Sequence, residues 1–423
     1  MKNIKRYIPT LVYDEIQKLE FKNKEHLYII CDMLYRISIY KKDSKDYSND
    51  FIDIPKYYFR DIICNSVYLG NAISILKEAN IILCDNNYSK NSGKALGYRF
   101  NSDLLSIIIP VEICSKTISK RIISNKNDRN NLVNEKYKVY KDYFLSTFKI
   151  DYDNALVYLN NWYNESISNL NSSLCGTNFN SEWIKIVNKY NHIAMSINAI
   201  NDGYLFFRRN DTNGRIDNNL TSLKSEYKQF IIKENLYQVD IINSQPFILS
   251  LYLNSSLCGT NFDEKELQKY NDWTSGGIFY EMFEKEYFSK TSKTLKRKEV
   301  KDIMFCIFYS KNGSYQKEKN IFKIMFPTIM EFIENEKKDK HNEFAIKLQK
   351  MESKICIDII CEELNKVGIK YYTIHDAWLI DKSNVKDVEK IIYSMFYKYF
   401  YRRPELKIEE VNNKIKTIKY EKI

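Results

Sequence analysis

The stretch LYQVDIINSQPFILSLYL, residues 236–253, decides the fold of the C-terminal half of the chain. Apolar and β-prone residues lead to Asp240, and the following NSQP is typical of a helix start with a proline in its first turn. We therefore expect Asp240 to lie at the end of a strand, directly before an apolar helix. Because aspartates at strand ends are common, this segment alone does not indicate a site.

A second segment, YYTIHDAWLID at 371–381, has β-prone runs on both sides of His375 and Asp376. This pattern predicts a tight hairpin with the Asp376 carboxylate at its tip. An ordinary turn aspartate would give the same pattern. Such turns usually carry Asn-Gly or Asp-Gly, however, so a His-Asp pair between two apolar runs is unusual turn chemistry.

A third segment, KRKEVKDIMFCIFYS at 296–310, places two cations and then two aromatic residues at steps of four. These residues are Arg297, Lys301, Phe305 and Tyr309. Each step of four drifts by only about 40° around an α-helix, so all of them share one helix face. Cations suit a triphosphate and aromatic rings suit a sugar and base, although an amphipathic helix with a solvated basic end would show the same spacing.

Taken together, the three segments fit one reaction, nucleotidyl transfer. This reaction uses two metal ions about 4 Å apart, one that activates the primer hydroxyl and one that binds the triphosphate. Two carboxylates from neighbouring strands can bridge such a pair, which predicts Asp240 and Asp376 as ligands of two Mg²⁺ ions. Lys301, beside the phosphates, can neutralise or protonate the leaving pyrophosphate.

The order and spacing of these segments resemble motifs A, B and C of the family A DNA polymerases, the DNA polymerase I type. That family shares its palm with the phage-type single-subunit RNA polymerases. Asp240 matches the motif A aspartate, the series of four matches motif B, and His375-Asp376 resembles the motif C pair. A further stretch, NDTNGRIDNNLTSL at 210–223, resembles the Thr-Gly-Arg element that precedes motif A. The resemblance covers roughly residues 205–423.

The resemblance implies a role for each matching residue. It implies that Asp240, Asp376 and Lys301 are catalytic, and that Arg215 and His375 contact the primer-template, with Arg215 along its minor groove. The nucleotide-binding residues that it implies are Arg297, Lys301, Phe305, Tyr309 and Gln245.

Several positions depart from the family pattern. Gln245 stands five residues after Asp240, where DNA polymerases of the family carry a glutamate that bars the ribose 2′-hydroxyl. Ser310 replaces the glycine after the motif B tyrosine, and Ala377 replaces the acidic or polar residue after His-Asp. The chain between motifs B and C is short, which implies reduced fingers. These departures leave the metal ligands in place and concern sugar choice and fidelity.

The N-terminal pattern predicts a winged helix-turn-helix over residues 24–101. Helical stretches at 24–40, 54–63 and 65–82 precede two strand-like runs around the polar loop KNSGK. Such a domain places its third helix in a groove of duplex DNA, although it can also serve protein contacts alone. The basic, polar residues 115–131 lack an apolar period and are interpreted as a linker.

The composition fits a nucleic-acid-binding protein of several domains. The chain has 423 residues, 44% of them apolar, and its 65 Lys and Arg exceed its 54 Asp and Glu to give a net charge of +11. Such an excess suits a polyanion, but a merely soluble basic protein would also show it. The nine cysteines form no C-x-x-C pair, which argues against zinc and favours a reducing, cytoplasmic location. The sequence shows neither a signal segment nor an apolar run of about 18 residues, so we expect no membrane contact.

The sequence therefore predicts an α+β protein in three parts: a winged-helix-like domain at 1–105, a basic linker and helical, thumb-like region at 106–200, and a polymerase palm with an antiparallel sheet and reduced helical fingers at 201–423. The expected activity is that of a DNA-directed DNA polymerase that acts on template-primer and nucleoside triphosphates, and the replication of a mobile element is the expected context. A single-subunit RNA polymerase-like enzyme and a non-catalytic DNA-binding replication initiator are the alternatives. The ten residues LNSSLCGTNF occur at 170–179 and again at 253–262, and we have no physical account of this duplication.

Overall fold

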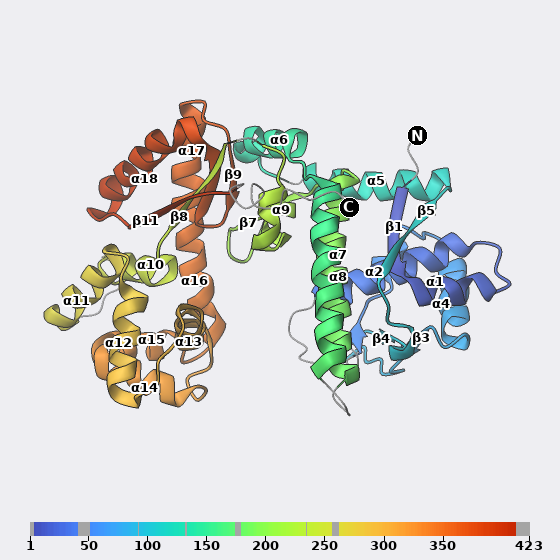
Figure 1. Cartoon of the computed structure of the whole chain (residues 1–423), viewed down its shortest axis with the longest axis horizontal. Coiled ribbons are helices and arrows are strands. Elements are labelled where there is room, and N and C mark those ends of the chain that lie inside the picture. The colour runs from blue at the N-terminus through green and yellow to red at the C-terminus, as the bar shows by residue number, and fades with distance from the viewer. Residues whose placement is uncertain are drawn as a thin grey trace. The chain divides into compact units, whose positions relative to one another are not determined.

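The computed structural model describes residues 4–40, 51–91, 93–131, 133–173, 179–233, 235–255 and 262–411 (Figure 1). Helices and antiparallel sheets alternate along the chain, as expected for an α+β protein. The chain forms two compact units. The first comprises 1–132, 148–206 and 222–232, and the second comprises 133–147, 207–221 and 233–423. These units do not follow the boundaries that the sequence predicts at residues 105 and 200, because strands and helices on both sides of each boundary pack together.

The elements of the first unit are β1 (Ile4–Pro9), α1 (Thr10–Lys18), α2 (Lys24–Tyr40), β2 (Ile52–Asp53), α3 (Tyr57–Arg60), α4 (Ser66–Glu78), β3 (Ile82–Cys84), β4 (Gly97–Phe100), β5 (Ile108–Ile113), α5 (Lys116–Asn131), α7 (Tyr152–Ser173) and α8 (Phe179–Asn201). Strand β4 lies between β2 and β3, and β1 pairs with β5 in a separate antiparallel ribbon. Helices α7 and α8 pack against each other along their length (Figure 1). The assignment of a winged helix to this unit stays a prediction.

Two sequence-based expectations for this unit need correction. Residues 115–131 do not form a linker, since 116–131 is the helix α5. The buried face of α5 is a narrow apolar stripe in which Ile118 and Ile122 lie one turn apart. Because the rest of the helix is polar, this stripe produces little apolar periodicity in the sequence. The helix expected at 54–63 is only the single turn α3, whereas the helix expected at 65–82 is present as α4, and Asn65 caps it by accepting from the amides of Val67 and Tyr68.

A buried ion cluster anchors the first unit. The fully buried carboxylate of Asp32 on α2 accepts hydrogen bonds from the Arg36 guanidinium at 2.9 and 3.0 Å and from the Tyr7 amide at 3.0 Å. Arg6 on β1 lies 3.4 Å from the same carboxylate. This cluster ties the ribbon to α2 by charge as well as by packing.

The elements of the second unit are α6 (Lys138–Thr147), β6 (Phe207–Arg209), β7 (Ile216–Asn218), α9 (Asn219–Ser222), β8 (Leu236–Ile241), α10 (Ser244–Leu253), α11 (Glu264–Ser275), α12 (Phe279–Thr291), α13 (Arg297–Tyr309), α14 (Gln316–Met325), α15 (Pro327–Glu336), α16 (His341–Ser353), a π-helical stretch (Lys354–Ile360), α17 (Cys361–Lys366), β9 (Tyr371–Ile374), β10 (Ala377–Asp381), α18 (Val385–Phe400) and β11 (Leu406–Glu410). The last residue of α9, Ser222, is counted with the first unit, whose segment 222–232 begins there.

A four-stranded antiparallel sheet in the order β11-β8-β10-β9 forms the centre of the second unit. The central strand β10 reads AWLID, and its first four residues are buried, as expected for a strand covered on both faces. Helix α18 packs against β8, and Phe396 of α18 meets Phe247 of α10 at a ring distance of 5.5 Å. Helix α16 contacts α10, α13 and α15 and continues into the π-helical stretch (Figure 1).

Among the described residues, none of the helices combines the length and apolar character needed to cross a lipid bilayer. Residues 174–178 and 256–261, which include Cys175 and Cys258 of the two copies of LNSSLCGTNF, lie outside the described residues.

Candidate active site

A cleft of about 690 Å³ in the second unit is lined by every site residue that the sequence predicts. These residues are Arg215, Asp240, Gln245, Arg297, Lys301, Phe305, Tyr309, His375 and Asp376. They come from the turn before β7, the β8–α10 junction, α13 and the β9–β10 turn. The geometry therefore brings together segments that lie up to 161 residues apart in the sequence, since Arg215 and Asp376 belong to the same cleft.

Asp240 and Asp376 lie at the ends of neighbouring strands. Asp240 is paired with Ala377 across β8 and β10, and the Ile241 amide donates to the Asp376 carbonyl at 3.3 Å. Ile374 pairs with Ala377, so His375 and Asp376 form a two-residue hairpin turn. His375 has a φ of 55°, which is the left-handed conformation that such turns require. The strand end and the hairpin expected from the sequence are both present.

The described residues offer no group of three or more His, Cys, Asp or Glu side chains suited to hold a metal ion. The two half-exposed aspartates still fit Mg²⁺, because this ion keeps several waters and often binds one or two carboxylates together with substrate phosphates. A pair of carboxylates that faces a cationic helix in an open cleft has this donor chemistry. A binding mode that depends on substrate phosphates needs no third protein ligand.

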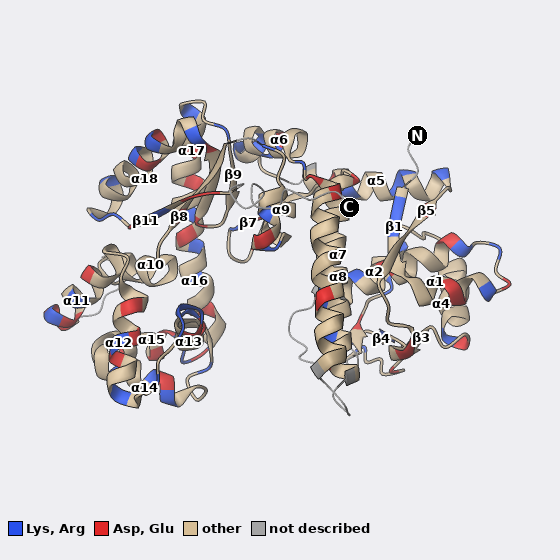
Figure 2. Ribbon diagram, in the orientation of Figure 1, with Lys and Arg blue, Asp and Glu red and all other residues tan. Residues whose placement is uncertain are grey.

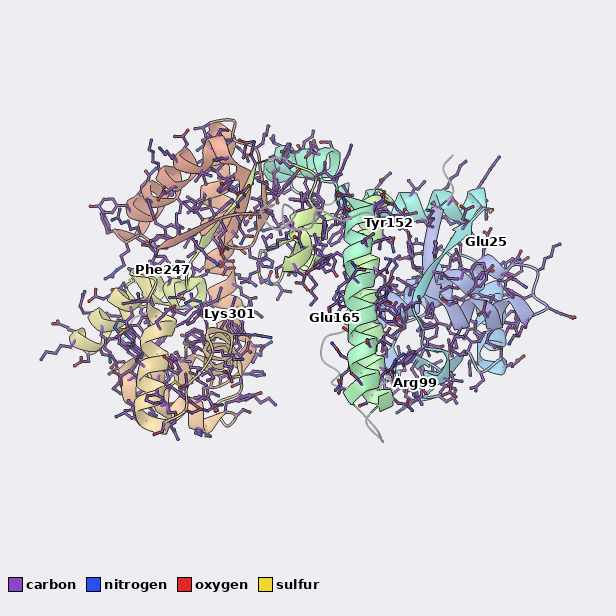
Figure 3. The ribbon with its side chains drawn as sticks, viewed as in Figure 1. Glu25, Arg99, Tyr152, Glu165, Phe247 and Lys301 are labelled. Atoms are coloured by element: carbon purple, nitrogen blue, oxygen red, sulfur yellow. The ribbon has the colours of Figure 1, made fainter. Side chains whose placement is uncertain are left out.

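Helix α13 presents its predicted face to the cleft. Phe305 and Tyr309 stack with ring centroids 5.5 Å apart, and the Lys301 ammonium lies 5.7 Å from the Phe305 ring. Arg297 is paired with Glu281 and lies over the ring of Tyr280. Figure 3 labels Lys301 on this helix, and Figure 2 shows the concentration of basic residues at its N-terminal end.

The end of α13 does not need the glycine of the family pattern. Ser310 has a φ of −83°, which any residue adopts, and its hydroxyl donates to the Cys306 carbonyl at 2.5 Å. The buried Lys337 ammonium donates to the Ile307 carbonyl at 2.6 Å, and burial lowers the pKa of Lys337 to about 8. The C-terminal carbonyls of α13 are thus held by a side-chain cation, which favours the dipole of the helix.

Glu352, which the sequence-based reasoning missed, lies at the centre of the cleft's polar contacts. It is 1% exposed, in the last turn of α16. One carboxylate oxygen accepts from Arg215 at 2.6 and 2.8 Å, and the other accepts from the Ser244 hydroxyl at 3.2 Å and from the Gln245 amide nitrogen. The Gln245 amide oxygen in turn accepts from the Tyr309 hydroxyl at 2.6 Å.

Burial, together with repulsion from Asp376, raises the pKa of Glu352 to about 7, although Arg215 opposes the shift. Burial and the same two acidic residues also raise the pKa of Tyr309 well above its ordinary value. A strongly shifted buried carboxyl in a cleft is a frequent mark of a functional site. Gln349, three residues earlier on the same helix face, also lines the cleft, but a spacing of three is common in helices and does not single out Glu352 in the sequence.

The local backbone before β7 positions Arg215. Gly214 has a φ of 71°, and a side chain at this position would lie 3.2 Å from the Arg209 guanidinium. The Asn213 side chain accepts from the Arg215 amide at 3.0 Å and donates to Gln349 at 3.2 Å. The turn therefore holds Arg215 against α16, although the two segments lie more than 100 residues apart in the sequence.

A second cleft, of about 1050 Å³, lies within the first unit. Its lining includes Lys22, Lys24 and Arg121, together with Asn65 and the half-exposed Tyr68 at the start of α4. Glu25 also lines it, but this carboxylate accepts from the amides at the start of α5. The cleft is thus basic, with an aromatic ring at its surface.

No protein-family model matches the sequence, and no curated protein matches it. Among solved structures, the chain is similar to the POL domain of Pol1 from M. smegmatis in complex with DNA primer-template and dNTP. The match covers 70% of this chain and 73% of that chain, with 9% sequence identity and a TM-score of 0.46. Values this low do not establish a family, so we base the functional assignment on the side chains of the cleft.

Proposed function

We propose that this protein is a template-directed nucleotidyl transferase, namely a DNA-directed DNA polymerase that replicates DNA. The observation that carries the proposal is the position of Asp240, which pairs with Ala377 across β8 and β10, next to Asp376 of the β9–β10 turn, in one cleft with the cationic and aromatic face of α13. A helix face and two strand ends that converge in this way match the needs of a metal-bound triphosphate and a primer end.

In the proposed reaction, Asp240 and Asp376 hold Mg²⁺, which supplies the positive charge that activates the primer hydroxyl and stabilises the leaving group. Lys301 and Arg297 bind the triphosphate, and Lys301 neutralises or protonates the departing pyrophosphate. Phe305 and Tyr309 provide the flat surface against which the base and sugar of the incoming nucleotide lie. His375 and Arg215 contact the primer-template.

Primer extension tests this proposal. The full chain with Mg²⁺ is given each combination of DNA or RNA template with dNTPs or NTPs, and we expect incorporation of dNTPs on a DNA template. Preference for NTPs would favour the RNA-synthesising alternative with the same metal ligands. DNA binding without any incorporation would favour the non-catalytic initiator. Asp240→Asn, purified in parallel, shows whether the activity belongs to this protein, and EDTA is expected to abolish it.

We also propose that the first unit contacts duplex DNA as a winged-helix-like domain, a role that suits the replication of a mobile element. The basic second cleft at the start of α4 supports this proposal, because phosphate contacts by Lys and Arg supply most sequence-independent affinity for DNA. A variant with Lys22→Glu and Arg121→Glu should bind duplex DNA more weakly, and its affinity should depend less steeply on salt.

The matched control for this experiment is Lys18→Glu with Lys185→Glu, because both are exposed cations of the first unit outside the cleft, paired with Glu15 and Glu182. Equal loss of affinity in both variants would indicate a general charge effect rather than a binding surface. Unchanged affinity in the cleft variant would contradict DNA contact at this cleft.

A further inference from the structure

We infer that Glu352 is a positioning residue for sugar selection, which fixes the Gln245 amide as a rigid wall beside the 2′ position of the incoming nucleotide. This inference rests on the proposed function and identifies how the cleft would distinguish deoxyribose from ribose. It starts from the chain of contacts Arg215–Glu352–Gln245–Tyr309.

The donor and acceptor pattern of this network favours one orientation of Gln245. In its ionised form, Glu352 accepts hydrogen bonds and cannot donate them, so it holds the nitrogen end of the Gln245 amide. The oxygen end is thereby turned to the Tyr309 hydroxyl, which donates to it. A flipped amide would set its oxygen against the carboxylate and lose that contact, while its nitrogen could still donate to the Tyr309 hydroxyl oxygen.

Glu352 is itself held in place, which makes it a fixed reference for Gln245. Arg215 occupies one carboxylate oxygen through two nitrogen atoms, and Ser244, the neighbour of Gln245, occupies the other. The backbone around Ser244 is the β8–α10 junction that follows Asp240. The carboxylate therefore connects the residue expected at the primer minor groove with the residue expected at the sugar.

A clamped Gln245 should exclude ribose rather than bind it. Gln245 is 7% exposed, and both ends of its amide are already engaged. A 2′-hydroxyl placed against such a wall would lose water without gaining a partner of its own, which is unfavourable for a buried polar group. An amide at this position could either exclude a 2′-hydroxyl or hydrogen-bond it, and the contacts of Gln245 favour exclusion.

The experiment measures kcat/KM for one dNTP and the matching NTP on the same primer-template. In Glu352→Gln the new amide can either donate or accept, so Gln245 is free to flip, and we expect the preference for dNTP to fall by roughly tenfold. Tyr309→Phe releases the other end of the amide and should lower the preference in the same direction. Glu363→Gln, a surface change on α17 paired with Lys366, is the control and should leave it unchanged.

Combination with Gln245→Ala separates positioning from a general structural role. If Glu352 acts through Gln245, the double variant should show the same sugar preference as Gln245→Ala alone. The inference is overturned if the effects of the two substitutions on sugar preference multiply in the double variant. It is also overturned if Gln245→Ala changes the sugar preference while Glu352→Gln keeps it within twofold of wild type. If Glu352→Gln does not fold, Tyr309→Phe decides the question by the same criterion. Wild-type protein that incorporates no nucleotide at all would instead overturn the proposed function, and this inference with it.

Discussion

Each unit of this protein buries one carboxylate against arginine, but the two carboxylates have opposite electrostatics. Burial raises the pKa of Asp32 in the first unit, yet Arg36, Arg6 and the Tyr7 amide outweigh it and hold the pKa below its ordinary value. In the second unit, the cation paired with Glu352 among the described residues is Arg215, and burial with repulsion from Asp376 raises the pKa of Glu352 to about 7.

We interpret the difference as that between a structural charge and a charge in the proposed active site. Asp32 is over-compensated by two cations and serves to hold β1 on α2. Glu352 is under-compensated because Arg215 does not offset its burial and the repulsion from Asp376. A fold tolerates this unfavourable arrangement most readily where the second carboxylate has a task, such as metal binding.

Asp240→Asn and Asp376→Asn should each lower nucleotide incorporation by about 1,000-fold or more, because each removes a charge that holds Mg²⁺ and so several kcal/mol of transition-state stabilisation. Single-turnover extension assays measure the loss. Affinity for primer-template, measured by fluorescence anisotropy, should stay close to wild type. Activity within tenfold of wild type in either variant would refute the assignment of the metal ligands.

Asp32→Ala should leave the activity of the folded protein unchanged but lower the free energy of unfolding by about 3 to 5 kcal/mol, because it leaves buried arginine charge without a partner. Chemical denaturation with a probe in the first unit measures this change. Asp376→Asn, by contrast, relieves repulsion and should not destabilise the second unit. A destabilisation of less than 1 kcal/mol for Asp32→Ala would contradict the structural role of the ion cluster.

The two carboxyls should also give opposite dependences of stability on pH. The folded-state pKa of Glu352 is raised, so its contribution to stability is fully present below pH 4.5 and is lost as pH rises to about 7, by roughly 3 kcal/mol. The folded-state pKa of Asp32 is lowered, so its contribution is present above pH 3.8 and is lost on further acidification. Denaturation of wild type and Glu352→Gln without divalent cations measures the first effect, which the variant should lack. An equal pH profile for both proteins would contradict it.

On helix α13, Lys301→Ala should lower the rate of the chemical step by roughly 100-fold, because it removes the acid or counter-charge at the leaving group. Arg297→Ala should weaken nucleotide binding only a few-fold, since Arg297 is more than half exposed and solvent screens its charge. Rapid-quench kinetics over a range of dNTP concentrations separates rate from affinity. Unchanged values in both variants would count against a nucleotide on this helix face.

The local structure around the site residues could be predicted from the sequence alone. The strand end at Asp240, the two-residue turn with Asp376 and the common face of α13 follow from periods and turn residues within about 20 positions, and local backbone geometry fixes them. The helix α5 and the one-turn extent of α3 could not be predicted in this way. Each has few buried residues, so its apolar positions form no recognisable period.

The contacts and the burial of Glu352, by contrast, arise only from the tertiary structure. Its partners Arg215, Ser244 and Gln245 lie 137, 108 and 107 residues away, and no local pattern encodes which distant segments pack together. From the sequence, a glutamate in a helix is expected to be a solvated surface charge. Its electrostatics change only when the fold buries it and brings a second carboxylate close to it. The positions of the two aspartates could thus be predicted from the sequence, whereas the network beside them exists only because packing places two remote segments, at Arg215 and at Ser244-Gln245, around one buried carboxylate.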